Sequence, residues 1–389
     1  MNVPKLRFKE FTEEWKKVEL DKLYEFKNGL NGDRSLYGKG VKLINVSDIL
    51  NNTYITSKVI NGKININEDT LRKNSVEYGD ILFQRSSETF LEIGTSNVYL
   101  DNKLVAFSGF VIRGKRKKDN INNPLFINYE LKSPTLRKKI IICGSGAQHF
   151  NIGQEDLKRI IIFLPSIQEQ RKIADMLELL DKKIELQTKK IEVLKLFKKG
   201  LNQRMFSKTG EFKSISKYVE EYTNKTIVNN QYPILSSTFN GIVIQNEYFN
   251  KQAASSKNIG YKIVPRSYIT YRSMSDTGEF HFNIQDKVDI GIVSPAYPVF
   301  KINNINVNYF LNYINESYDF KMQIISIKEG GTRYALGFNK FKKLKIKIID
   351  DDEFYGDFIK KLNEYLLLED KKLDDLNKLK KGFMQNMFI

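Results

Sequence analysis

The sequence predicts a mixed α/β protein in which two similar globular domains are separated by two long antiparallel coiled-coil helices, arranged as a pseudo-twofold internal repeat. Three observations predict this fold class. A motif from the middle of the chain returns at its end, a heptad pattern precedes both copies, and short alternating segments with Asn- and Gly-rich turns fill the remainder. The 389 residues also exceed the roughly 250–300 at which a single core stops growing.

The repeat is clearest in two matching stretches. KKGLNQRMF at 198–206 returns as KKGFMQNMF at 380–388, a displacement of 182 positions (380 minus 198). Self-similarity at a fixed offset indicates one structural unit used twice. Upstream at the same offset, apolar residues superpose position for position: Ile173, Leu177, Leu180, Ile184, Ile191 and Leu194, then Tyr355, Ile359, Leu362, Leu366, Leu373 and Leu376. A chance match between unrelated core helices is the alternative, and the shared register argues against it.

Both apolar patterns advance in steps of four and three residues, which is the a/d pattern of a coiled coil. Gln187 and Glu369 occupy the polar position of each seam, and such a residue tends to set register at some cost in stability. A helix over residues 166–199 would span roughly 50 Å at about 1.5 Å per residue. Each copy therefore predicts a long amphipathic helix.

Capping signals mark the ends of these helices. Pro165 and Ser166 supply a breaker and an N-cap candidate for the first helix, and the acids of IDDDEF at 349–354 favour the start of the second. Gly200 and Gly382, at equivalent points, are predicted as C-terminal caps or kinks.

The similarity extends into the globular parts. Residues 144–165 resemble 330–350, each with a glycine-rich turn, a short helical piece and a basic-apolar strand, and residues 79–87 resemble 266–274. The intervening segments diverge, which is typical of similar scaffolds that bind different targets. The predicted boundaries are 1–165 for the first domain, 166–206 for the central helix, 207–350 for the second domain and 351–389 for the distal helix.

The charge of the chain favours a polyanionic partner. A formal net charge of +17 and a pI near 9.4 attract nucleic acid first and anionic membranes second, and a lysine-rich proteome with a solvated surface is the alternative. Cys143 is the only cysteine, so no intramolecular disulfide can form. The opening residues are charged where a signal peptide needs an apolar run, and a cytoplasmic location is expected.

Catalytic and metal-binding motifs are not recognisable. Two histidines and one cysteine do not supply a typical zinc site. GDRSLYGKG at 32–40 lacks the spacing and the Ser or Thr of a phosphate loop. NNPLF at 122–126 approaches the Asn-Pro-Pro-Phe tetrapeptide of amino-methyltransferases but has leucine for the second proline, and the Glu-x-Lys trios, such as Glu130 with Lys132, lack the Pro-Asp of nucleases. The chain is expected to carry no catalytic site and no metal.

The chain nevertheless resembles a known family along nearly its whole length. The opening PKLRFKEFTEEWKKVELDKLYEFKNG, the central helix with its Gln-Arg-Met-Phe ending, YRSMSDTGEFHFNIQDKVDIGIVSPAYPVF at 271–300 and the closing helix together resemble the specificity subunit of type I restriction-modification enzymes. Each piece alone is a weak signal, and their joint occurrence is specific.

The resemblance implies a non-catalytic, DNA-binding role in bacterial defence. It implies two target recognition domains, each recognising one half of a bipartite target in double-stranded DNA, and two helices that dock two methyltransferase (modification) subunits. It further implies that this chain binds no cofactor itself. Partner subunits use S-adenosylmethionine, ATP and magnesium, and restriction subunits carry out translocation and cleavage. The implied location is the bacterial cytoplasm.

Candidates for DNA contact are the polar and basic residues at the ends of the repeated strands and beside the repeated glycine turns. They are Gln84, Arg85, Ser86, Ser87 and Gln148 in the first domain, and Arg272, Ser273, Ser275, Asp276, Thr277, Thr332 and Arg333 in the second. Arg85 and Arg272 share a repeat position, and a structural or phosphate-binding role is the alternative for both.

Apolar residues on the outer part of the helices are candidates for docking a partner subunit. They are Leu186, Phe197, Leu201, Met205, Phe206, Leu368, Leu379, Phe383, Met387 and Phe388. Closure of the intramolecular seam is the alternative for this set. Two other classes of protein remain open at this point: an autonomous DNA nuclease or methyltransferase with an unrecognised site, and a membrane-surface scaffold.

Overall fold

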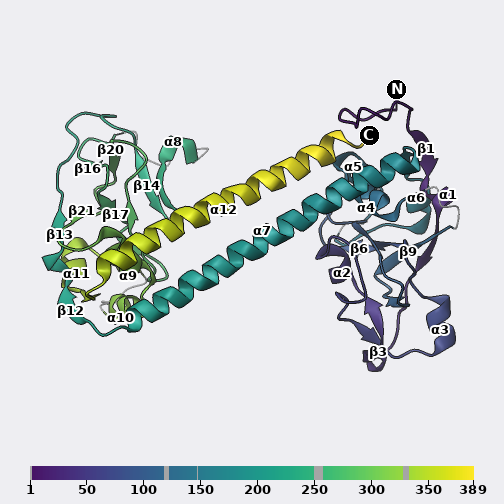
Figure 1. Cartoon of the computed structure of the whole chain (residues 1–389), viewed down its shortest axis with the longest axis horizontal. Coiled ribbons are helices and arrows are strands. Elements are labelled where there is room, and N and C mark those ends of the chain that lie inside the picture. The colour runs from purple at the N-terminus through teal and green to yellow at the C-terminus, as the bar shows by residue number, and fades with distance from the viewer. Residues whose placement is uncertain (1, 118–121, 147, 249–256, 327–332) are drawn as a thin grey trace. The chain divides into compact units, whose positions relative to one another are not determined.

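The computed structural model describes residues 2–117, 122–146, 148–248, 257–326 and 333–389 (Figure 1). The chain divides into two compact units. Unit 1 comprises Met1–Thr188 with Lys371–Ile389, and unit 2 comprises Lys189–Asp370. Each unit contains one globule together with part of each long helix. The four-segment division made from the sequence stays a prediction.

Unit 1 is built on a four-stranded antiparallel sheet with the order β2-β9-β5-β7. A second, three-stranded sheet has the order β4-β3-β8, and β1 pairs with β11. The elements are β1 Lys16–Glu19, α1 Leu20–Leu23, β2 Tyr24–Asn28, η1 Arg34–Leu36, β3 Tyr37–Ile44, α2 Val46–Leu50, β4 Lys63–Ile64, α3 Glu68–Lys73, β5 Ile81–Gln84, β6 Ser86–Ser87, β7 Ser96–Val98, β8 Ala106–Phe107, β9 Val111–Arg116, α4 Pro124–Lys132, α5 Pro134–Ile142, β10 Phe150–Asn151, α6 Gln154–Lys158 and β11 Ile161–Leu164.

Unit 2 has a four-stranded antiparallel sheet with the order β13-β21-β17-β19. Its elements are β12 Glu211–Ser214, η2 Ile215–Lys217, β13 Val219–Glu221, β14 Leu235–Thr238, β15 Gly241–Ile244, α8 Gln245–Tyr248, β16 Lys262–Pro265, β17 Ile269–Thr270, β18 Met274–Ser275, β19 Asn283–Ile284, β20 Ile290–Val293, β21 Val299–Ile302, α9 Val307–Glu316, α10 Tyr318–Ser326, β22 Tyr334–Ala335, α11 Phe338–Lys343 and β23 Lys345–Ile348.

The two units repeat one topology. The four-stranded sheets share their strand order, and the pairing of β1 with β11 in unit 1 corresponds to that of β12 with β23 in unit 2. In both units a pair of helices follows the last sheet strand, α4 with α5 and α9 with α10. The mixed α/β class and the internal repeat are therefore confirmed.

Asparagine caps begin the first helix of each pair. Asn123 Oδ1 accepts a hydrogen bond from Phe126 N at 2.9 Å, and Pro124 follows at the first helical position, where its missing N–H costs nothing. Asn306 caps α9 in the same way. The NNPLF sequence is thus explained as a helix start.

The long helices are α7, Ile167–Ser207, and α12, Asp352–Asn386 (Figure 1). In unit 2, Lys190 Nζ of α7 lies 3.0 Å from Glu369 Oε2 of α12, and the ring of Phe197 lies 6.4 Å from that of Phe358, so the helices run antiparallel. In unit 1, Lys380 Nζ of α12 lies 2.5 Å from Asp181 Oδ1 of α7. The predicted pair of packed helices is confirmed.

Of the two roles predicted for the repeated glycines, the C-terminal cap is wrong, and the kink stays a prediction. Gly200 and Gly382 both lie inside a helix, because α7 continues to Ser207 and α12 to Asn386. The helical hydrogen bonding of the following turn outweighs the local preference of glycine for a cap.

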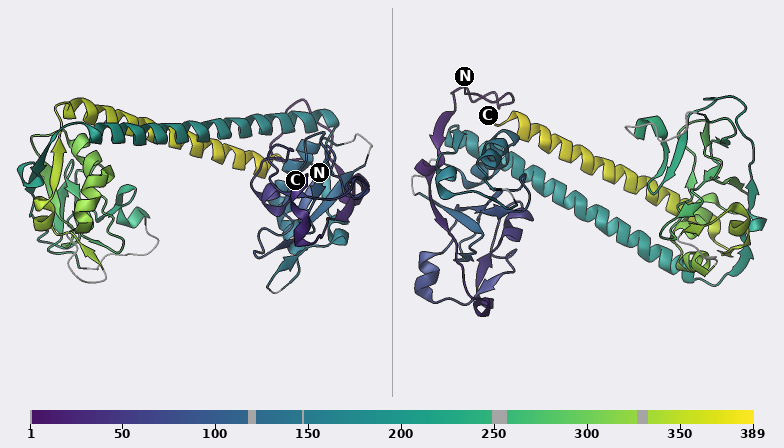
Figure 2. Two further views of the ribbon diagram at one scale, coloured as in Figure 1. Left: turned by 90° about the horizontal axis from the view of Figure 1, so that it is seen from below. Right: turned by 180° about the vertical axis from the view of Figure 1, so that it is seen from behind.

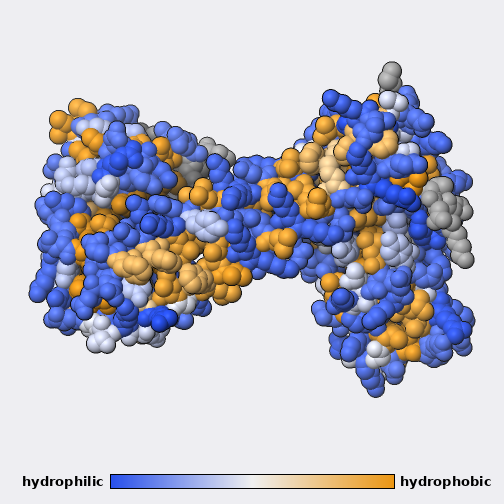
Figure 3. Space-filling view, viewed as in Figure 1, coloured by the Kyte–Doolittle hydropathy of each residue, from blue (hydrophilic) through white to orange (hydrophobic). Residues whose placement is uncertain are grey.

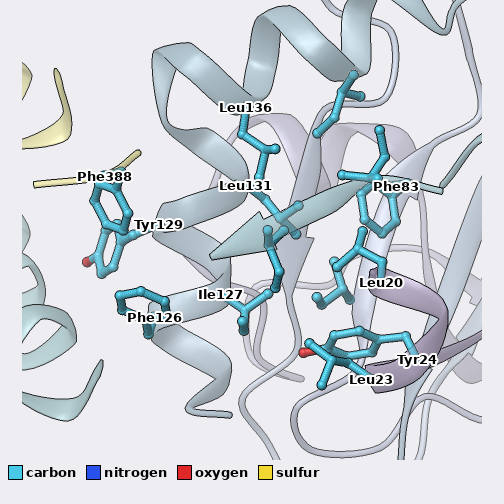
Figure 4. Close-up of a cluster of buried hydrophobic side chains, with 14 of the residues drawn as sticks. Leu20, Leu23, Tyr24, Phe83, Phe126, Ile127, Tyr129, Leu131, Leu136 and Phe388 are labelled. Carbon is cyan, nitrogen blue, oxygen red and sulfur yellow. The ribbon is translucent and has the colours of Figure 1, made fainter. Parts of the chain in front are cut away.

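The end of α12 belongs to the core of unit 1. Met384, Met387 and Phe388 lie in the same buried cluster as the α4 residues, and the ring of Phe388 lies 5.6 Å from that of Phe126 (Figure 4). Tyr129, also on α4, donates its hydroxyl to Asp181 of α7 at 2.8 Å. Side chains of α4 therefore hold both long helices to unit 1.

An irregular N-terminal segment before β1 contacts the end of α12 and the start of α7 (Figure 2). Leu6 N donates to Asn386 O at 2.8 Å, at the end of α12. Arg7 Nε lies 2.7 Å from Glu169 Oε1 in the first turn of α7, and Trp15 Nε1 donates to the same oxygen at 3.3 Å. Because Glu169 is buried, these contacts satisfy a charge that burial alone would make costly.

Candidate nucleic-acid interface

In unit 2 the predicted DNA-contacting residues meet at a small open cavity. It has a volume of about 310 Å³ and is lined by Ser237, Thr238, Phe239, Arg272, Met274, Ser275, Asp276, Thr277, Glu279, Phe280 and His281. Four of the predicted residues, Arg272, Ser275, Asp276 and Thr277, lie in its wall. Ser273 is half-buried and is not part of the lining. Thr332 lies outside the described residues.

A two-stranded antiparallel ribbon forms one side of this site. Strand β18 pairs with β22 in the register Met274 opposite Ala335 and Ser275 opposite Tyr334. The next position along the ribbon brings Asp276 opposite Arg333, and Arg333 Nε lies 2.8 Å from Asp276 Oδ1. Both side chains are more than half exposed, so the ion pair lies at the surface beside the cavity.

A hydrogen-bonded turn follows Asp276. Ser275 Oγ accepts from Gly278 N at 3.0 Å and lies 3.4 Å from Thr277 Oγ1, which in turn accepts from Glu279 N at 3.3 Å. Gly278 has a φ of +86°, and a Cβ there would come within 3.2 Å of the Tyr334 ring, so glycine is required. The turn therefore has little freedom.

Sequence reasoning missed the three aromatic residues of the cavity, Phe239, Phe280 and His281. Phe239, at the tip of the β14–β15 hairpin, is 74% exposed, and its ring lies 4.5 Å from that of His281. Burial lowers the pKa of His281, which favours the neutral imidazole. The sequence FNGI at 239–242 predicts only a turn. The contact of Phe239 with His281 depends on strand pairing that the local pattern does not encode.

The corresponding residues of unit 1 are more enclosed. Gln84 and Ser87 are buried, and Gln84 Nε2 donates to Ser86 O at 3.0 Å. Arg85 is half-buried, with its guanidinium 3.4 Å from Gly109 O. Ser86 Oγ donates to Asn151 Oδ1 at 2.5 Å across the β6–β10 pair. Ser86 and Arg85 are therefore more accessible to a ligand than Gln84 and Ser87, and Gln148 is exposed.

Both units carry the same ribbon with the same Ser-acid-Thr turn. In unit 1 it reads Ser87-Glu88-Thr89, with Ser87 Oγ 3.4 Å from Thr89 Oγ1 as in unit 2, and Thr89 N donates to Ser87 Oγ at 3.1 Å. Phe150 lies opposite Ser87, where Tyr334 lies opposite Ser275. The next position of that register brings His149 opposite Glu88. The Ser-acid-Thr sequence and the contact between its two hydroxyls are thus shared, whereas the backbone hydrogen bonds of the turn and the basic residue across from its acid differ.

The predicted docking residues divide into exposed and buried sets. Leu186, Phe197, Leu368 and Leu379 are each about half to two-thirds exposed on the long helices, where hydrophobic side chains lie among hydrophilic ones (Figure 3). Met205, Met387 and Phe388 are instead buried in the cores of their own units. Leu201, Phe206 and Phe383 are half-buried, the last two packed on those cores.

A more voluminous cavity, about 890 Å³, lies in unit 2 where α7 and α12 meet the start of α10. Lysines of α7, including Lys195 and Lys198, line it together with Leu366 and Tyr318. Of the predicted residues it includes only Phe206, from the docking set, so it is associated with the helices rather than with the ribbon.

No group of three or more His, Cys, Asp or Glu side chains in the described ranges is arranged to hold a metal ion. Within that same part of the chain, no helix combines the length and the apolar character needed to cross a membrane.

Comparisons with known proteins agree on one family. The family model for the type I restriction modification DNA specificity domain matches residues 12–196. A putative type I restriction enzyme specificity subunit from Methanocaldococcus jannaschii is 25% identical over 420 aligned residues, which cover 98% of this chain and 95% of the relative.

Solved structures share the fold along the whole chain. The crystal structure of a type I restriction-modification system S subunit from M. genitalium has a TM-score of 0.62 at 14% identity, covering 100% of this chain and 99% of that one. A structure reported for complex assembly and conformational transition of the type I R-M system has a TM-score of 0.51 at 11% identity, covering 96% and 97%.

Proposed function

This chain belongs to the family of type I restriction-modification specificity subunits, and we propose that it recognises a bipartite target in double-stranded DNA, one half with each unit. Within the type I complex, members of this family supply DNA specificity and are not catalytic. The autonomous nuclease or methyltransferase considered from the sequence is therefore set aside.

The observation that carries the bipartite proposal is the duplicated ribbon. Each unit has the same two-stranded ribbon and Ser-acid-Thr turn, while the residues around it differ. A common scaffold with different exposed groups suits two half-sites of different sequence. A two-stranded ribbon fits the major groove of B-DNA, where base edges are distinguishable. The net charge of +17 supplies the attraction to phosphate.

Arg272 tests this proposal directly. Its side chain is exposed and lines the unit 2 cavity. We expect Arg272→Ala in the full chain to relax the choice of base at one position of one half-site, because a group that contacts a base edge contributes about 1–3 kcal/mol of discrimination. The measurement is enrichment of randomised 40-base-pair duplexes, sequenced after binding to the full chain.

The outcomes separate two roles of Arg272. A motif that stays unchanged while affinity falls equally on all duplexes would assign Arg272 to a phosphate. Lys217 is a suitable control because it is exposed, basic and in the same unit, yet lies outside the cavity. Lys217→Ala should leave the motif intact.

Partner subunits complete the proposed activity. We propose that the exposed apolar residues of α7 and α12 dock two methyltransferase subunits, and that restriction subunits join this assembly. S-adenosylmethionine, ATP and magnesium would then be used by those partners. The cytoplasm, where DNA is accessible to such a complex, is the proposed location. We no longer propose a bacterial host, because the curated relative is archaeal.

A further inference from the structure

The ion pair between Asp276 and Arg333 is unusual for a DNA-binding surface. A carboxylate beside the duplex is repelled by the phosphates, so an exposed acid there is unfavourable unless it contacts a base or orients another side chain. Here the acid lies 2.8 Å from the guanidinium Nε of Arg333. The carboxylate of Asp276 therefore contacts an arginine side chain at this surface.

The pair is also poorly suited to anchoring a phosphate. The carboxylate offsets part of the positive charge that a backbone contact would use. The pair still presents the planar donor geometry of the Arg333 guanidinium. With Nε committed to Asp276, the two terminal nitrogens of Arg333 remain as a pair of donors in one plane.

The turn after Asp276 makes this geometry reproducible. Ser275 Oγ and Thr277 Oγ1 accept the backbone N–H groups of Gly278 and Glu279, which fixes the backbone around Asp276. Gly278 packs on the ring of Tyr334, the neighbour of Arg333 on the opposite strand. The acid and the arginine therefore lie across from each other at the end of one hydrogen-bonded ribbon, and an ordered backbone of this kind favours preorganised recognition.

We infer that Arg333, oriented by Asp276, recognises one guanine in the major groove of the half-site bound by unit 2. Guanine is the base that presents two adjacent acceptors, N7 and O6, on its major-groove edge, and the paired donors of arginine match them. This inference rests on the proposed function and adds a base preference to it. In unit 1 the same turn lies across from His149, so the corresponding position there has a different preference.

The test uses the full chain and the randomised duplex library. The wild-type motif should contain guanine at a position where Arg333→Ala lowers the preference for guanine about tenfold or more. Arg333→Lys should lose the same preference, because an ammonium keeps the charge without the paired donors. Asp276→Asn, which keeps an acceptor but not the charge, should give a smaller loss at the same position.

A matched control exists in the same unit. Arg266 Nε lies 3.0 Å from Asp289 Oδ1 in an exposed ion pair outside the cavity, and Arg266→Ala removes the same charge. We expect its motif to equal that of the wild type. An Arg333→Ala motif that is unchanged, or a uniform loss of affinity on all duplexes, would overturn the guanine assignment alone. If the wild-type chain enriched no motif, both this inference and the proposed function would fail.

Discussion

Glu130 illustrates how a residue that resembles a catalytic group can be structural. Its carboxyl group is 3% exposed on α4, and Oε1 accepts a hydrogen bond from Phe163 N of β11 at 2.6 Å. Burial raises the pKa of Glu130 to about 8, and the nearby Lys139 lowers it only in part. Glu130 is therefore mostly neutral at pH 7 and ties α4 to β11, which explains the Glu-x-Lys trio without a nuclease.

This burial predicts a pH dependence of stability. The folded state keeps a proton on Glu130 up to about pH 8, whereas its ordinary pKa is 4.5, so stability falls as pH rises between these values. Glu130→Gln does not titrate and keeps the Oε1 acceptor. Between pH 6 and 8 we expect the wild type to lose about 2 kcal/mol relative to Glu130→Gln, measured by thermal unfolding.

Other titrating groups cancel in that comparison. Burial lowers the pKa of Lys132 to about 7, and this group is present in both proteins. Glu155→Gln is the control, because Glu155 is a surface residue paired with Lys158. Parallel pH profiles for the wild type and Glu130→Gln would contradict the assignment of a buried, neutral carboxyl group.

At the scale of elements, the seam between α7 and α12 contains a buried charge. Glu369 is 1% exposed, and its Oε2 lies 3.0 Å from Lys190 Nζ, whose side chain is almost half exposed. The hydrogen bonds to Tyr365 and Glu369 raise the pKa of Lys190. A buried ion pair of this kind is costly to break and contributes mainly to register. The polar seam position predicted at Glu369 thus has an identified partner.

The two ways of removing this pair should differ. Lys190→Met removes the ammonium from a buried carboxylate and should lower the free energy of unfolding by about 1–3 kcal/mol, reduced by the partial exposure of Lys190. The double variant Lys190→Met/Glu369→Leu should recover most of this loss, because both seam positions become apolar. Thermal unfolding followed by circular dichroism measures both. A double variant no more stable than Lys190→Met would disprove the account.

The outer faces of the same helices carry the proposed docking surface. Leu186 and Leu368 occupy equivalent repeat positions and are both more than half exposed. A deletion of the last ten residues would not test docking alone, because Met384, Met387 and Phe388 belong to the core of unit 1. Surface substitutions are the better test.

We expect Leu186→Glu/Leu368→Glu to abolish copurification with a methyltransferase subunit while leaving the melting temperature unchanged. The reason is that two buried carboxylates would be unpaired at an apolar interface. Ile227→Glu is the matched control, because Ile227 is 80% exposed in unit 2 and lies outside both long helices. Copurification of the double variant at wild-type yield would exclude these leucines from the interface.

At the scale of the whole molecule, the proposal requires the helices to set the distance between half-sites. One additional helical turn near Lys189 lengthens α7 by about 5.4 Å, which corresponds to one or two base pairs at about 3.4 Å each. We expect the number of unspecified base pairs to change while both half-sites stay the same. Sequencing of enriched duplexes measures the spacer. An unaltered spacer together with intact half-sites would show that the helices do not set the distance between half-sites.

The fold could be predicted from the sequence because its signals are periodic and local. The heptads recur within each helical stretch, and the two stretches match at one fixed offset of 182 residues. Ile173, Leu177 and Ile359 are buried as the pattern requires. The ends of the helices were less predictable. In the sequence, Met387 and Phe388 are part of an apolar tail and look like exposed residues. Only the tertiary contact with α4 shows that they are core residues.

The candidate site was predictable only where its residues are contiguous. Arg272 to Thr277 follow one strand, whereas Phe239 and His281 meet through strand pairing between distant segments. The repeated Ser-acid-Thr turn was not predicted for another reason. Its copies are 188 positions apart (275 minus 87), whereas the comparison of residues 79–87 with 266–274 has an offset of 187 (266 minus 79) and misaligns them by one residue.

The anchoring of α12 in unit 1 has a consequence for synthesis of the chain. Met384, Met387 and Phe388 complete a hydrophobic core whose other members begin at Trp15. A ribosome must therefore translate through residue 388 before this core is complete, and an interrupted product would expose apolar surface to chaperones and proteases. Prematurely terminated chains should consequently be degraded rather than compete with intact copies for DNA.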